Sequence, residues 1–73
     1  MSDYKFMKIN IQNVNYLIRS QELKMWWIAE EAGIHKTTLR RWLNGKIDGI
    51  RPENISKLAR VLSTDSSYIV EKR

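Results

Sequence analysis

Side chains that can bind nucleic acid crowd one short stretch of this 73-residue chain, KTTLRRWLN at positions 36–44. Guanidinium groups can donate two hydrogen bonds to guanine, a threonine methyl group can contact thymine, and lysine, arginine or asparagine can bind phosphates. Five Lys and Arg residues and one Asp lie between positions 36 and 51, so this segment carries +4 of the formal net charge of +5. Because the charge is localised, the composition favours a polyanionic partner.

The same stretch separates into two faces when it is wound as an α-helix at about 100° per residue. The apolar face holds Leu39, Trp42 and Leu43. The opposite face holds Lys36, Thr37, Arg40, Arg41 and Asn44. We therefore predict a helix that is anchored on its apolar side and bare on its cationic side, of a width that the major groove of DNA admits. The alternative is an ordinary solvated basic face; we favour DNA because the cations cluster and acids are missing.

Apolar spacing predicts five helices that position this face, near residues 11–20, 25–32, 36–44, 52–62 and 65–71. Three of them share a start signal if Lys24, His35 and Arg51 are the N-caps. Each of these residues has an apolar neighbour before it and another at the fourth helical position, which is the hydrophobic staple. Thr37 or Thr38 could instead cap the third helix.

Gly33 and Gly45 lie where helices commonly end on a left-handed residue, and Pro52 suits the first position of a helix. The segment KIDGI at 46–50 is then the main loop. Residues 1–10 form a separate arm before a domain at 11–73. Tyr4, Phe6 and Ile9 alternate there with lysines, which predicts a short strand or a loosely docked arm.

The chain has no cysteine, so neither disulfides nor thiolate metal ligands are available, and helix packing must supply its stability. No apolar run approaches the roughly 18 residues that span a bilayer, and the start does not resemble a signal peptide. We expect a cytoplasmic protein without a membrane partner. One histidine, no Gly-rich loop and scattered carboxylates predict no catalytic residues, no metal and no cofactor, hence no enzyme.

The segments IAEEAGIHKTTLRRWLNG and RPENISKLARVL resemble the helix-turn-helix domains of phage repressors and Cro proteins. The resemblance covers roughly residues 14–70 and rests on Ala29, Gly33, Ile34, Leu39, Trp42, Gly45, Pro52, Leu58, Ala59 and Leu62. It implies an all-α, compact, five-helix lambda-repressor-like fold with the helix-turn-helix at helices two and three. Independently of the family, a small Ala29 allows helices two and three to cross closely, and Gly33 permits the tight turn.

The resemblance also implies roles for single residues. Contacts to bases fall to Lys36, Thr37, Arg40 and Arg41. Contacts to the DNA backbone fall to Lys24, Met25, Thr38, Asn44 and Lys46. Family members usually carry Thr or Ser and then Gln where Lys24 and Met25 stand, so the Gln contact to phosphate is lost here. His35 replaces the usual Ser or Thr cap of helix three, as a cap substitute or a phosphate neighbour.

The adjacent residues Trp26 and Trp27 cannot both face one core, because neighbouring helical residues diverge by about 100°. The buried stripe of this helix is Met25, Ile28, Ala29 and Ala32. Trp26 lies at its edge and can lean onto helix one or four, whereas Trp27 points away. Trp27 either covers a gap against the amino-terminal arm or forms a protein contact with Glu30 and Glu31. The resemblance makes RNA polymerase a conceivable partner of those acids.

Together these observations predict a repressor- or Cro-like regulator of transcription that binds double-stranded DNA in a bacterial or phage-infected cytoplasm, on the nucleoid. A homodimer on a pseudo-palindromic operator is expected, because one helix buries too little surface to be selective. Its dimer surface would be residues 68–70 or the arm at 4–9; the alternative role of these residues is closure of the core. The alternative function is a protein-binding module, such as an antitoxin or antirepressor subunit, that uses Trp27, Glu30 and Glu31. RNA binding is disfavoured because the basic face lacks stacking aromatics.

Overall fold

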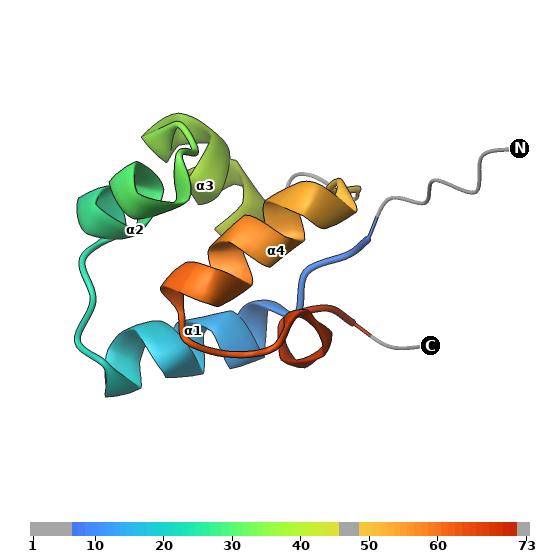
Figure 1. The fold of residues 1–73 in the computed structure, drawn as a ribbon, viewed down its shortest axis with the longest axis horizontal. Helices are drawn as coiled ribbons and strands as arrows, with labels where there is room; N and C mark the ends of the chain where they lie inside the picture. The colour runs from blue at the N-terminus through green and yellow to red at the C-terminus, as the bar shows by residue number, and fades with distance from the viewer. Residues whose placement is uncertain (1–6, 46–48, 72–73) are drawn as a thin grey trace, which may run out of the picture.

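Four α-helices and one 3-10 turn make up the part of the chain that this computed structural model describes, residues 7–45 and 49–71. They follow in the order α1 (Ile11–Ser20), α2 (Met25–Ala32), α3 (Lys36–Leu43), α4 (Pro52–Val61) and η1 (Ser66–Tyr68). Figure 1 shows α2 and α3 together at one end of the molecule. The all-α class and the first four predicted helices are confirmed. Predictions for Tyr4, Phe6 and Lys46 lie outside the described residues.

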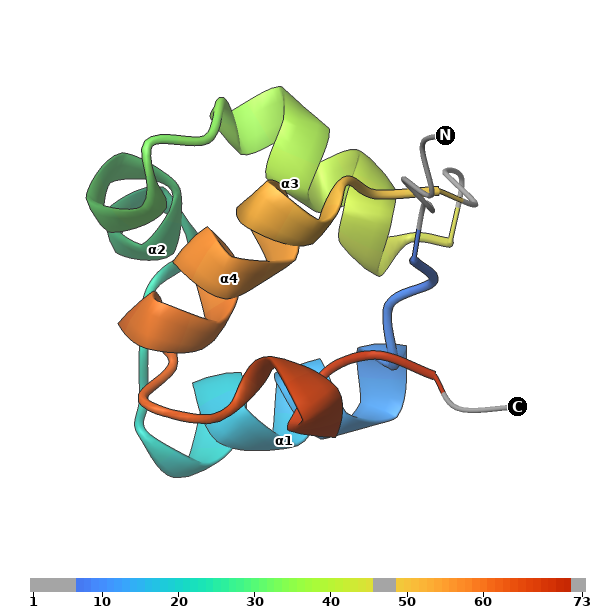
Figure 2. The same cartoon turned by 45° about the vertical axis from the view of Figure 1, so that its right-hand side comes forward.

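The helix α4 occupies the middle of the fold, with α2 and α3 on one side of it and α1 on the other (Figure 2). Its inward residues Ile55 and Leu58 and its C-cap Leu62 are fully buried. The other helices contribute Val14, Ile28, Leu39 and Trp42 to the same core. No polar or charged residue is buried among those described, so hydrophobic packing holds the fold together. None of the helices in this part of the chain is long and apolar enough to cross a membrane.

The fifth predicted helix, at 65–71, is wrong: only the 3-10 turn η1 forms there. The reason is a competing long-range pairing. The Asn10 N–H donates to the Ile69 carbonyl at 2.8 Å, and the Glu71 N–H donates to the Lys8 carbonyl at 2.8 Å. These bonds and the bridge between Ile9 and Val70 pair the segment after η1 with the arm, and Ile69 is fully buried, so the helical turn ends there.

Residues 7–10 of the arm run between two distant segments of the chain. Met7 and Ile50 exchange both of their backbone hydrogen bonds at 2.8 Å, and Ile9 forms an antiparallel bridge with Val70. These are isolated bridges, and no strand occurs among the described residues. Ile9 is only 3% exposed, so this end of the arm is docked into the core rather than loose.

The helix boundaries follow the predicted caps. Lys24, His35 and Arg51 are the N-caps of α2, α3 and α4, each with extended backbone angles. The start of α1 had no predicted cap; there the Asn10 side-chain oxygen accepts from the Asn13 N–H at 3.1 Å. Since an N-cap leaves the helical path, these residues fix where each helix begins.

Candidate nucleic-acid interface

The turn from α2 into α3 begins at Gly33, the C-cap of α2. Gly33 is left-handed at φ 70°, and the N–H of Ile34 donates to the Ala29 carbonyl at 2.9 Å. A residue with a Cβ is disfavoured at such an angle, which explains the glycine. Ala29 is 5% exposed and belongs to the core cluster.

The helix α3 is anchored on one side only. Leu39 and Trp42 are 0% and 4% exposed, and Leu43 is half-buried against the core. The opposite side presents the four residues predicted to contact bases, all of them exposed: Lys36, Thr37, Arg40 and Arg41. The structure therefore brings these four side chains to one surface.

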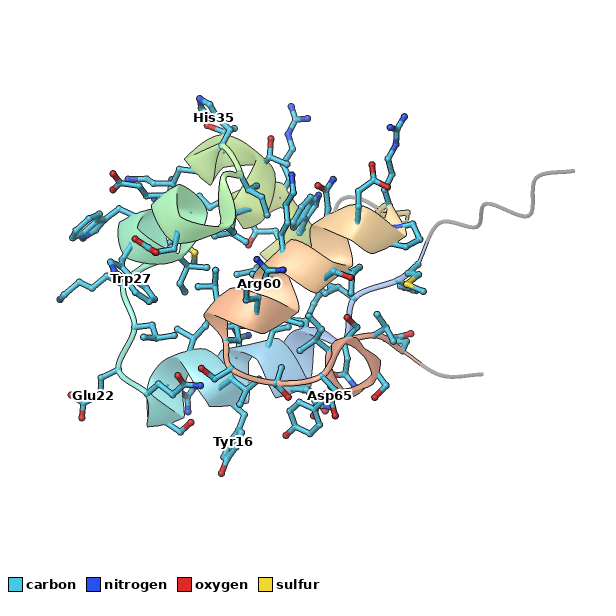
Figure 3. The ribbon with its side chains drawn as sticks, viewed as in Figure 1. Tyr16, Glu22, Trp27, His35, Arg60 and Asp65 are labelled. Carbon is cyan, nitrogen blue, oxygen red and sulfur yellow. The ribbon has the colours of Figure 1, made fainter. Side chains whose placement is uncertain are left out.

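The first turn of α3 is organised by His35. Its Nδ1 accepts a hydrogen bond from the Thr37 N–H at 3.2 Å, so the imidazole takes the place of a Ser or Thr cap. Neither Thr37 nor Thr38 is the cap. His35 lies at the outer edge of the molecule and points away from its body (Figure 3). The prediction of a cap substitute is confirmed.

The electrostatics of α3 are one-sided. The helix carries Lys36, Arg40 and Arg41 and no acidic residue. Within the described part of the chain, none of the three side chains makes a hydrogen bond or an ion pair. Their charges are therefore not neutralised by the protein itself. Exposed guanidinium groups in a fixed helical array suit bidentate contacts to guanine and to phosphate.

The residues expected at the DNA backbone are placed less uniformly. Lys24 is exposed and caps α2 without a side-chain hydrogen bond, and Asn44 is the exposed C-cap of α3. Thr38 is half-buried. The Met25 side chain packs against the core, so only its backbone can reach a ligand. Lys46 lies outside the described residues.

The two tryptophans of α2 take the reverse of the expected exposures. Trp26 is 55% exposed and Trp27 is 36% exposed. Figure 3 labels Trp27 on α2, and its side chain is more covered than that of Trp26. Trp26 does not lean back onto the core. A helical wheel gives side-chain directions within one helix only, and here it predicted the opposite order of exposure.

Residues 28–69 match the helix-turn-helix family, of the Cro and C1 type. The chain belongs to this helix-turn-helix family. Regulators of this class bind double-stranded DNA. A stretch of 36 residues is 42% identical to the HTH-type transcriptional regulator KdgR of Bacillus subtilis strain 168. That stretch is 49% of this chain and 11% of the KdgR chain, so only a small part of the relative is shared.

Two solved structures share the fold of this helix-turn-helix domain. Native PhpD with cadmium atoms has a TM-score of 0.74, and PhpD with cadmium complexed with hydroethylphosphonate has a TM-score of 0.73. Each is 23% identical and covers 90% of this chain, but only 14% of its own length. At this identity the likeness shows the fold alone.

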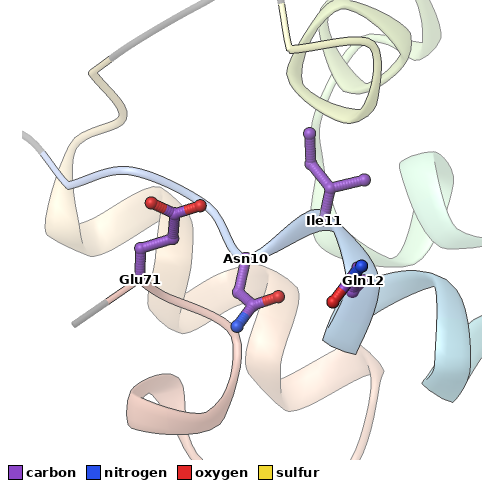
Figure 4. Close-up of a pocket in the computed structure, with 4 residues that line it drawn as sticks. All are labelled: Asn10, Ile11, Gln12 and Glu71. Carbon is purple, nitrogen blue, oxygen red and sulfur yellow. The ribbon is translucent and has the colours of Figure 1, made fainter.

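Two hollows in the described part of this helix-turn-helix domain have no residue of α3 in their linings. One is lined by Asn10, Ile11, Gln12 and Glu71 (Figure 4). The other lies between the start of α1 and η1 and is lined in part by Asn13, Asp65 and Tyr68. Neither hollow is lined by a residue of α2 or α3. The helix-turn-helix presents a helix rather than a hollow, and a helix fits the major groove.

The structure adds one cation that the site prediction left out. Arg51 is exposed and caps α4 without a side-chain hydrogen bond. The residue before it, Ile50, is buried and bonded to Met7, so its backbone is held in place. The sequence signal that could have identified Arg51 was its place in the basic segment 36–51.

Proposed function

We propose that this domain binds double-stranded DNA sequence-specifically and regulates transcription, in the manner of a repressor or Cro protein, with α3 in the major groove. The observation that carries the proposal is the division of α3. Leu39 and Trp42 hold one side in the core, while Arg40 and Arg41 are exposed and unpaired within the described residues. In helix-turn-helix proteins the second helix of the motif contacts base edges and the first crosses the backbone.

The contacts divide accordingly between the two helices of the motif. Base edges are assigned to Lys36, Thr37, Arg40 and Arg41. The sugar–phosphate backbone is assigned to Lys24, Met25, Thr38, Asn44 and Lys46. Met25 acts through its amide, since its side chain is packed inward. Members of the family are in general not enzymes, and we assign no reaction to the domain.

A homodimer on a pseudo-palindromic operator would double the contacts that one helix can make. Among the described residues of the surfaces predicted for dimerisation, Ile69 and Ile9 are 0% and 3% exposed and belong to the core. Tyr68, at 39% exposed, remains accessible. With DNA as its partner, the domain would act on the nucleoid, in the cytoplasm of a bacterium or a phage-infected cell.

Selection of bound duplexes from a random pool tests this proposal. We expect an enriched sequence, and a log–log plot of affinity against salt with a steep negative slope, because phosphate contacts release counterions. Two enriched half-sites about one helical turn apart would establish the dimer. Absence of any retained duplex in dilute salt would refute DNA binding.

A second candidate function is a protein contact through Trp27, Glu30 and Glu31, as in an antitoxin or antirepressor subunit or a regulator that touches RNA polymerase. All three residues are exposed, and the two glutamates make no ion pair within the described residues. Exposed aromatics are enriched in protein interfaces. Changing Glu30 and Glu31 to Lys should abolish transcriptional activation and leave operator binding in place. Unaltered activation with intact operator binding would exclude polymerase contact.

A further inference from the structure

We propose that the surface formed by α1 and η1 is an interface between two copies of this chain, in which Tyr16 of each copy sits in a hollow of the other. The hollow is the one between the start of α1 and η1, lined in part by Asn13, Asp65 and Tyr68. The inference goes beyond the proposed function, because this surface contains no residue of the helix-turn-helix motif.

Tyr16 is the projecting half of this surface. At 62% it is the most exposed of the large hydrophobic side chains that the structure describes. Figure 3 shows it pointing away from the body of the molecule, and its hydroxyl makes no hydrogen bond to any described residue. A tyrosine combines a large apolar ring with a polar tip, and tyrosines are enriched in the buried centres of protein interfaces.

The hollow beside Tyr16 is the receiving half. The Asn13 side chain donates from Nδ2 to the Tyr68 carbonyl at 2.7 Å, which holds η1 against the first half of α1. Asn13 precedes Tyr16 by one helical turn, so the hollow that it lines lies next to Tyr16. Asp65 is exposed, and its side chain makes no capping hydrogen bond at the start of η1. The Asp65 carboxylate can therefore accept a hydrogen bond from a tyrosine hydroxyl.

The two flanks of Tyr16 differ in charge. Asn13 and Arg19 are each three residues from Tyr16, so they lie about 60° to either side of it on the helix. The flank at Asn13 leads to Asp65, whereas the other flank carries Arg19. The Arg19 side chain is exposed and makes no ion pair within the part of the chain that the structure describes.

These features make the surface complementary to itself. In a two-fold dimer both copies use the same surface, so a residue that meets a second residue is matched by the reverse contact. A half-turn that brings Tyr16 of one copy over the hollow of the other also brings its Arg19 flank over the Asp65 flank. Opposite charges then face each other, which favours correct pairing. A second copy of this chain is therefore the partner that the surface fits.

Such a pair would carry its two cationic helices on opposite outer faces. Figure 3 shows Tyr16 and His35, the N-cap of α3, at opposite edges of the molecule. Because a two-fold interface at one edge leaves the far edges pointing apart, each copy would hold its own duplex. This consequence, unlike the interface, rests on the proposed function. Two half-sites on one short duplex would require pairing through a different surface.

Sedimentation equilibrium of the intact chain without DNA, from micromolar to millimolar concentration, tests the interface. We expect a monomer–dimer equilibrium. Tyr16→Ser should raise the dissociation constant at least about 10-fold, because a central aromatic residue commonly dominates an interface. Trp26→Ser is the matched control: it removes a ring that is 55% exposed on α2 and should leave the constant unchanged. Circular dichroism would confirm that both variants are folded.

Charge reversal gives a second readout. Arg19→Asp and Asp65→Arg should each weaken pairing about 2- to 5-fold, the range of an exposed ion pair. The chain with both changes carries inverted charges on the two flanks and should pair like the unaltered chain. A double variant that pairs no better than the single variants would contradict the contact between these flanks.

The outcomes separate the interface from DNA binding. A chain that stays monomeric at millimolar concentration, or a dimer that Tyr16→Ser leaves intact, overturns the inference and leaves the proposed function in place. If the chain pairs through Tyr16 but retains no duplex, the interface stands and the proposed function fails.

Capture of a fluorescent duplex by an immobilised one tests the arrangement on DNA. The unaltered chain should link the two duplexes, whereas Tyr16→Ser should bind each of them without linking them. A dimer that depends on Tyr16 and binds duplexes without linking them would overturn the opposed placement of the two α3 helices.

Discussion

The Nδ1 of His35 accepts a hydrogen bond from the backbone N–H of Thr37 at 3.2 Å, and this bond begins the helix that presents the cationic face. An imidazole thus satisfies a backbone donor that helix geometry leaves unpaired. The same turn carries Lys36 and Thr37, both assigned to bases. The stability of the domain and the order of its DNA-binding helix are therefore linked through one side chain.

Replacing His35 by Ala should lower the free energy of unfolding by about 0.5–2 kcal/mol, the usual cost of a lost N-cap. Urea denaturation followed by circular dichroism measures the change. His35→Ser is the control, because serine is a good cap and should restore most of the stability. Equal destabilisation by both variants would show that the imidazole contributes packing rather than capping.

Replacing Gly33 by Ala should destabilise the domain by about 1–2 kcal/mol through backbone strain alone. The residue has φ 70°, and an added Cβ would meet nothing within 4 Å, so no clash contributes. Gly33→Asn should cost less, because asparagine tolerates left-handed angles better. Thermal unfolding of the three chains would rank them, and an Asn variant as unstable as the Ala variant would contradict the strain argument.

Replacing Trp42 by Ala should cost about 3–5 kcal/mol, because the side chain is 4% exposed and anchors α3. A domain of this size has little stability to lose, so the variant should be largely unfolded. Loss of circular dichroism at ambient temperature is the measurement. A folded Trp42→Ala chain would mean that α3 is held chiefly by other contacts.

Replacing Arg41 by Ala should cost about 1–3 kcal/mol of binding free energy and relax preference at one base pair. Replacing Lys24 by Ala should instead weaken all sequences alike and lower the salt slope by about one. Both follow from the proposed division of contacts. Binding of each variant to a set of single-base changes in the selected duplex is the measurement, and identical profiles would overturn the division.

Replacing Ile69 by Ala should cost about 2–5 kcal/mol, because its side chain is fully buried in the core. Replacing Tyr68 by Ala should cost much less, since that side chain is 39% exposed. Sedimentation at matched folded concentrations would show whether either change alters the oligomeric state. A dimer lost on changing Ile69 in an otherwise stable chain would contradict its role in core closure.

Local signals explain the parts of the fold that could be predicted. Apolar periodicity located α1 to α4, and the staples around Lys24, His35 and Arg51 placed three helix starts correctly, because both depend on residues a few positions apart. Local signals could not show that the helix predicted at 65–71 is absent. The turn η1 ends because the residues after it pair with residues about 60 positions earlier, near Ile9 and Val70.

The candidate site likewise has a part that local sequence signals predicted and a part that they could not. The two faces of α3 follow from the helical period, so the exposure of Arg40 and Arg41 was predictable. The Met25 side chain packs against the core, so the DNA-backbone contact that the resemblance implies for this residue is proposed for its amide. Trp26 is more exposed than Trp27, the reverse of the order that the helical period of α2 predicted, because the period of one helix does not describe how the rest of the chain covers it.

The antiparallel bridge between Ile9 and Val70 also has a consequence for how the domain could be rewired. It brings the two extremities of the described chain side by side, at the opposite end of the molecule from the turn between α2 and α3 (Figure 1). Short linkers could therefore splice the whole unit into a host protein, or join its ends in a circular permutant opened elsewhere. The helix α3 would keep its orientation in either arrangement.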